Sequence, residues 1–62
     1  MWIITRDGVA ININHVSKLV CRGNDTYAKV DGQTTIISDG NVIQPILGAL
    51  KNHETTIDFR VL

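Results

Sequence analysis

At residues 26–37 the chain reads TYAKVDGQTTII, two short runs of apolar and β-branched residues joined by an aspartate and a glycine. In the first run Ala28 and Val30 alternate with an aromatic and a charged residue, the two-residue period of a strand with two unlike faces. The Asp31-Gly32 dipeptide indicates a tight type I′ turn, because that turn needs a positive φ that glycine adopts without steric cost. The stretch therefore predicts a β-hairpin.

The same dipeptide recurs at Asp7-Gly8 and Asp39-Gly40. The first separates an apolar run at residues 2–5 from an alternating run at residues 9–13, so we expect another hairpin there. Asp39-Gly40 stands where the spacing of apolar residues changes from that of a strand to that of a helix, so it predicts a strand-to-helix junction. A run at residues 16–22, less regular in its alternation, predicts one more strand.

One helix is expected at about residues 41–51. Its apolar residues recur at the spacing of a single helical stripe: Val42, Ile43, Ile46, Leu47 and Leu50. Two starts are possible. Asn41 can cap the helix together with Gln44, three residues later, or the helix can begin with Pro45 as its first residue. Gly48 costs roughly 1 kcal/mol relative to alanine inside a helix. We interpret this glycine as a site of close packing on the sheet.

The last run, residues 55–62, alternates again and predicts a final strand with Ile57, Phe59 and Val61 turned inward. Together these elements predict an α+β fold in a single domain, residues 1–62: a small antiparallel β-meander of five to six strands with the one helix packed on the sheet. The expected core draws on every part of the chain: Val9, Ile11, Ile13, Leu19, Val30, Ile36, Ile43, Leu47, Leu50, Ile57 and Phe59.

The size and charge of the chain limit its function. A chain of 62 residues buries only about 60% of the surface that its unfolded form exposes, so a monomer should be marginally stable. Exposed sheet edges then favour a homodimer or a higher oligomer. Six basic and six acidic residues give a net charge of zero, which disfavours nucleic-acid binding without excluding it.

The expected location is the cytoplasm. A secreted domain of this size would carry several disulfides, whereas this chain has a single cysteine. The apolar runs are too short for a membrane span, and the first residues lack the pattern of a signal peptide. We therefore expect no membrane partner.

Reactive side chains are few and scattered. His15 and His53 are the first candidates for acid or base chemistry, but positions in a turn and at the end of a helix account for them. Cys21 has Lys18 and Arg22 close in sequence, which would favour a thiolate, yet a cysteine within a strand is typical of a small buried residue. Metal-ligand and phosphate-loop spacings are absent. We expect a protein that is not an enzyme, with no catalytic, cofactor or metal site.

Aromatic and basic residues are the candidates for binding. Trp2 and Tyr27 are candidate protein contacts, because an exposed aromatic residue on a small protein marks a protein–protein interface more often than a base-stacking site. The alternative is a nucleic-acid surface, which requires basic residues to gather on one face. Its candidate contacts are Arg6, Lys18, Arg22 and Lys29.

The chain resembles the small flagellar proteins of the FlbD/SwrD type. The shared order is an "LTR.NG" strand and turn, an asparagine-containing strand, a "DT" strand, a glycine turn and a short helix. The matching residues are Ile4, Thr5, Arg6, Gly8, residues 11–14, Asp25, Thr26, Gly32 and residues 42–46. Asp7 stands where asparagine is usual, and residues 55–62 have no clear equivalent there.

Residues 11–61 also resemble part of a LytTR DNA-binding domain. That domain has an apolar strand, a "Y…DG" hairpin, a helix and a strand with phenylalanine and arginine. The corresponding residues here are Tyr27, Asp31-Gly32, residues 47–50 and Phe59-Arg60. The LytTR domain is longer and has basic loops that this chain lacks.

Two hypotheses follow. The first is a small non-catalytic accessory or regulatory protein of a bacterium or one of its mobile elements, which acts through protein–protein contacts as a homo-oligomer. It rests on the missing catalytic patterns and on the resemblance to FlbD/SwrD proteins. The alternative is a nucleic-acid-binding regulator that resembles a truncated LytTR module.

Overall fold

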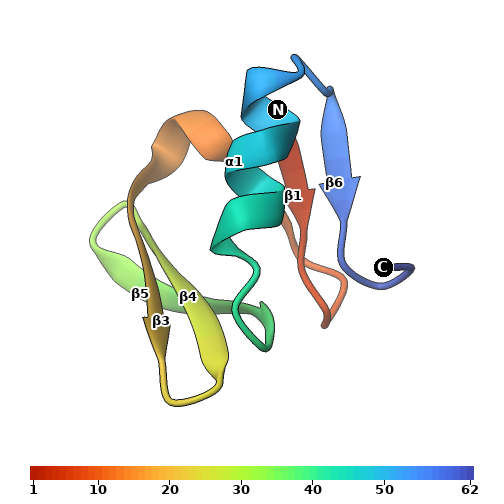
Figure 1. Cartoon of the computed structure of the whole chain (residues 1–62). Helices are drawn as coiled ribbons and strands as arrows, with labels where there is room; N and C mark the ends of the chain where they lie inside the picture. The colour runs from red at the N-terminus through yellow and green to blue at the C-terminus, as the bar shows by residue number, and fades with distance from the viewer.

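Two three-stranded sheets and one helix surround a small core (Figure 1). A computed structural model describes all residues, 1–62. In chain order the elements are β1 (Trp2–Ile4), β2 (Ala10–Asn12), the 3₁₀ helix η1 (Ile13–His15), β3 (Val16–Arg22), β4 (Asp25–Val30), β5 (Gln33–Asp39), α1 (Ile43–Lys51) and β6 (Thr56–Asp58). The strand orders are β2-β1-β6 and β3-β4-β5. The α+β class with one helix is confirmed, but the strands divide between two sheets instead of forming one meander.

Strand β6 breaks the predicted antiparallel pattern. It pairs in parallel with β1, Ile57 opposite Ile3, because the long connection from β1 to β6 brings the chain back in the same direction. It ends at Asp58, whose side chain accepts a hydrogen bond from the Arg60 N–H (2.9 Å) and turns the chain. The predicted strand to residue 62 is therefore too long. Phe59 is buried as expected, but Val61 is exposed rather than turned inward.

The aspartate-glycine dipeptides make two different turns and one junction. At Asp31-Gly32 both residues have a positive φ, 49° and 87°, which matches the predicted type I′ turn. At Asp7-Gly8 only the glycine does, and its N–H donates to the carbonyl of Thr5 (2.9 Å), so this hairpin has a longer turn. Asp39-Gly40 connects β5 to α1, as predicted.

The core lies where both sheets meet the helix. It consists of six buried apolar residues: Ile3, Ile11, Ala28, Ile37, Ile46 and Phe59. Four other residues predicted for the core pack against this cluster: Ile13, Leu19, Val30 and Ile57. Val9, Leu47 and Leu50 were predicted to be buried and are exposed.

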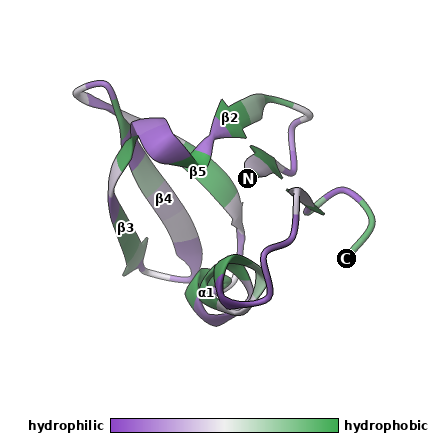
Figure 2. Ribbon diagram, turned by 90° about the horizontal axis from the view of Figure 1, so that it is seen from above, coloured by the Kyte–Doolittle hydropathy of each residue, from purple (hydrophilic) through white to green (hydrophobic).

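Local geometry explains the misplaced residues. A register shift beside Thr26 adds one residue to β5, so Ile37 fills the core while Ile36 lies opposite Tyr27 on the other face. Helix α1 contacts both β3 and β6, and Figure 2 shows it nearly end-on beside the two sheets. Its buried residues are Ile46 and Ala49. Leu47 and Leu50 therefore lie on an exposed ridge, 45% and 39% exposed.

Helix α1 begins at Ile43, two residues later than predicted. The side-chain oxygen of Asn41 accepts a hydrogen bond from the Ile43 N–H (3.1 Å), so Asn41 supports the helix start. Pro45 is the third helical residue rather than the first. The predicted close packing of Gly48 on the sheet is wrong, because a Cβ atom at this position would meet nothing within 4 Å beyond its chain neighbours and the backbone of its own helix.

The Thr26 hydroxyl fastens the junction between β5 and α1. This side chain is fully buried, and its Oγ1 donates to the carbonyl of Gly40 (2.7 Å) and accepts from the N–H of Val42 (2.9 Å). Both groups belong to the segment between β5 and α1, where no sheet or helix partner is available to them. One hydroxyl of β4 therefore fixes the point at which the chain leaves the sheet and enters the helix.

Replacing Gly48 by alanine should raise the free energy of unfolding by roughly 0.5–1 kcal/mol, because alanine is the better helix former and has room here. Urea denaturation with an unchanged m-value would measure it. Gly32→Ala is the matched control and should destabilise the chain, since Gly32 has φ of 87°. Lower stability of Gly48→Ala would contradict the open environment of Gly48.

Replacing Thr26 by valine should lower the free energy of unfolding by about 2–4 kcal/mol, because two backbone groups lose their partner. Thr26→Ser keeps the hydroxyl and should recover most of this loss. Denaturant midpoints of both variants would measure the difference. A valine variant as stable as the wild type, or more stable than the serine variant, would show that the methyl group of Thr26 contributes more than its hydroxyl.

Candidate functional site

The face of β3-β4-β5 that points away from the core gathers most of the predicted binding residues. Strand alternation turns Ala28 toward the core and Tyr27 and Lys29 away from it. Lys18 lies opposite Lys29, and Val20 lies opposite Tyr27. We call this surface the outer face. Six of its residues line a shallow hollow of about 290 Å³: Lys18, Val20, Arg22, Tyr27, Lys29 and Thr34.

The basic residues of the outer face have no acidic partner. The ion pairs of the chain are Arg6 with Asp39, His15 with Asp31, and Arg60 with Asp58. Lys18, Arg22 and Lys29 form none, and among the remaining basic residues only Lys51 is also unpaired. A chain of zero net charge thus has a local excess of positive charge around Tyr27.

Lys18 and Lys29 form a like-charged pair across two neighbouring strands. Residues directly opposite in an antiparallel pair have Cβ atoms roughly 5 Å apart, and like charges there are destabilising. Both side chains are exposed, so nothing in the core requires either of them to be lysine. A cross-strand pair of like charges lowers stability, and such unfavourable local pairs are expected at functional sites.

The other end of the outer face is close to neutral. Arg22 lies opposite Asp25, which in turn lies opposite Asp39 on β5. Arg6 approaches this end from the β1–β2 turn and pairs with Asp39, Nη2 to Oδ2, at 3.6 Å. The structure therefore brings together three of the four predicted nucleic-acid contacts and leaves Arg6 neutralised at the margin.

The two candidate protein contacts lie on different sheets. Trp2 is 48% exposed on β1, between Asn12 and Thr56 of the neighbouring strands. Tyr27 is half-buried at the centre of the other sheet, between Val20 and Ile36. They do not form one continuous aromatic surface.

The reactive side chains have structural positions. His15 Nδ1 lies 3.2 Å from Asp31 Oδ2, so the imidazole links η1 to the β4–β5 turn. His53 adopts a positive φ (57°) at the end of α1, where its N–H donates to the Leu50 carbonyl (3.1 Å). This is the expected helix-end role.

Cys21 is partly buried on the core-side face of β3. Lys18 and Arg22 lie on the opposite face, because strand alternation separates them from the thiol. These two cations therefore do not flank the sulfur, although they are close in the sequence.

Arg60 acts within its own turn. Its Nε and Nη2 donate to the two carboxylate oxygens of Asp58 (3.0 and 2.8 Å). This hydrogen-bonded contact holds the pKa of Asp58 below its usual range and raises the pKa of Arg60. The pair closes the turn that carries Phe59 into the core, and Arg60 takes no part in the outer face.

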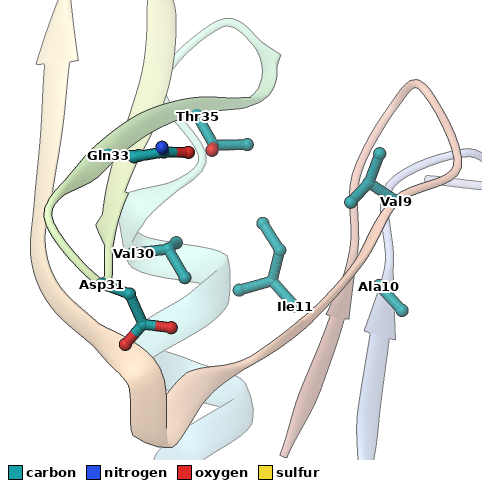
Figure 3. A pocket seen from close by; sticks show the side chains of 7 residues that line it. All are labelled: Val9, Ala10, Ile11, Val30, Asp31, Gln33 and Thr35. Atoms are coloured by element: carbon teal, nitrogen blue, oxygen red, sulfur yellow. The ribbon is translucent and has the colours of Figure 1, made fainter.

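A second hollow, of about 470 Å³, separates β2 from the β4–β5 hairpin (Figure 3). Val9 and Ile11 project into it from one side, and Val30, Gln33 and Thr35 from the other. It contains no basic residue. It depends on how the two sheets meet, so no local sequence pattern predicts it.

Sequence reasoning missed Val20 and Thr34 as members of the outer face. The sequence contained a signal for Val20. It lies two residues from both Lys18 and Arg22, so a strand places all three on one face. Gly23-Asn24 forms a two-residue connection that pairs Arg22 with Asp25 and sets the register. Together these features align the two strands residue by residue.

The chain contains no helix of the length and apolar character needed to cross a membrane. Its histidine, cysteine and acidic side chains do not come together in any group of three that could hold a metal ion. Comparison of the chain with protein-family models, with curated proteins and with solved structures gives no match.

Proposed function

We propose that this protein is a non-catalytic binding module and that its outer face binds the phosphate backbone of a nucleic acid. The observation that carries the proposal is that Lys18 and Lys29 lie opposite each other beside Tyr27 and that neither has an acidic partner. An anionic partner relieves the repulsion between the two ammonium groups and gains two charge-assisted contacts. The resemblance to a LytTR domain, which binds DNA, supports the same partner class.

The charge balance sets the strength of this interaction. With a net charge of zero, the protein has no long-range field to attract a polyanion, and contacts at short range must supply the binding energy. Screening by salt acts strongly on exposed charges of this kind. We therefore expect weak binding that disappears as the salt concentration rises. A regulatory role in the bacterial cytoplasm is part of the proposal.

The test combines binding and stability. Fluorescence anisotropy at low salt, with labelled single-stranded and duplex DNA and RNA, should show binding to the full chain. Lys29→Gln should weaken it, because one phosphate contact is lost, and should also raise the free energy of unfolding by about 0.2–1 kcal/mol, because the like-charged pair is removed.

Lys51→Gln is the matched control, since Lys51 is also exposed and unpaired but lies in the last turn of α1. It should leave binding unchanged and should not raise the free energy of unfolding, because a lysine at the end of a helix is favourable there. Absence of binding to every polyanion at low salt would overturn the proposal. So would equal binding loss in the Lys29 and Lys51 variants, because the outer face would then have no special role.

Self-association through the exposed ridge of α1 is a second candidate function. Leu47 and Leu50 are apolar residues of a nine-residue helix that remain 45% and 39% exposed. Only ten of the 62 residues are buried, so covering this ridge with a second copy would enlarge a small core. Trp2, on strand β1, is a further exposed residue that could contact a second copy.

Light scattering and sedimentation over a range of protein concentrations would measure the oligomeric state. The wild type should dimerise, and Leu47→Gln with Leu50→Gln should shift it toward the monomer, because the apolar contact area is lost. Val9→Thr changes an exposed apolar residue outside α1 and should leave the dimer intact. A wild type that is monomeric at all concentrations would overturn self-association.

A further inference from the structure

We infer that the outer face binds single-stranded rather than double-stranded nucleic acid, with a base stacked on Tyr27 and phosphates held by Lys18 and Lys29. This inference rests on the proposed nucleic-acid function and adds the class of ligand and the contact that selects it. It follows from three features of the face: the position of Tyr27, the sheet on which it lies, and the distribution of charge around it.

Tyr27 lies at the centre of the face. It is on the middle strand of β3-β4-β5, with Val20 on one side and Ile36 on the other. Both neighbours are aliphatic, and the half-buried state of Tyr27 leaves part of its side chain open to solvent. Aromatic side chains on a sheet or groove are the usual stacking platforms for unpaired bases.

The shape of the face disfavours a duplex. Base edges in a duplex are reached through the grooves, which admit a helix or a projecting two-stranded ribbon. The only α-helix of the chain packs on the core side, where Ile46 joins Ala28 and Ile37. The residues around Tyr27 come instead from all three strands of the sheet, so a sheet face and not a projecting element carries them. Stacked bases inside a duplex could not reach Tyr27.

The charges mark the extent of the site. The Lys18–Lys29 pair lies two positions along the strands from the Val20–Tyr27 pair, toward the β4–β5 turn, and Arg22 lies two positions away in the opposite direction. Asp25 and Asp39 follow at that far end and would repel further phosphates. The face therefore offers up to three phosphate contacts. Neutralising three phosphates of a single strand predicts a slope of about −2 for log K against log salt concentration.

The experiment uses the full chain and three labelled probes of about ten nucleotides: oligothymidylate, the corresponding duplex, and an abasic strand with the same phosphates. Oligothymidylate should bind best. The abasic strand should bind about tenfold more weakly, because it lacks the stacking contact. Tyr27→Leu should bind oligothymidylate about tenfold more weakly and the abasic strand as well as the wild type does, whereas Tyr27→Phe should retain the preference.

Lys29→Gln should bind both strands more weakly and reduce the salt slope by about 0.7, and Lys51→Gln should reproduce the wild type. Circular dichroism would verify that each variant is folded. The abasic comparison uses wild-type protein, so it holds even if Tyr27→Leu does not fold. Equal affinity for the duplex, or for the abasic strand, would overturn this inference while leaving nucleic-acid binding standing. Failure to bind any of the probes at low salt would overturn both.

Discussion

The fold depends on the hydroxyl of Thr26, because it holds the place where the chain leaves one sheet and enters the helix. With its bonds to Gly40 and Val42, this buried group leaves neither of those backbone groups unpaired. The position of α1 follows from it, since the helix begins at the next residue, Ile43. Once α1 is placed, Ile46 can meet residues of both sheets, and the core closes around it.

Few other contacts join the two sheets. The Arg6 N–H donates to the carbonyl of Ile37 (2.9 Å), a direct backbone bond between the β1–β2 turn and β5. The Arg6 side chain pairs with Asp39 at the same place, and the core cluster adds contacts of Ile3 and Ile11 from one sheet with Ala28 from the other. A structure with so few links gains much from each one. We therefore expect a single threonine and a six-residue core to have a large influence on the arrangement of the chain.

The outer face is independent of that arrangement. Its members come from three adjacent strands joined by short turns, so the hairpin register alone brings Lys18 to Lys29 and Val20 to Tyr27. The core-side residues of the same strands hold the sheet in place and point away from the outer face. Charge can therefore be concentrated on this face at a local cost in stability, while ion pairs neutralise Arg6 and Arg60 elsewhere in the chain.

The sequence by itself determined the local structure: the Asp31-Gly32 turn, the alternation of β4, the helix after Gly40 and the α+β class. Turn chemistry and periodicity act over a few residues, which is why they are visible in the chain. Only the tertiary structure decided that β6 pairs in parallel with β1, that Ile37 replaces Ile36 in the core, and that Leu47 and Leu50 remain outside it. These outcomes depend on contacts between segments far apart in the sequence, and on one bulge and one hydroxyl that no periodic pattern encodes.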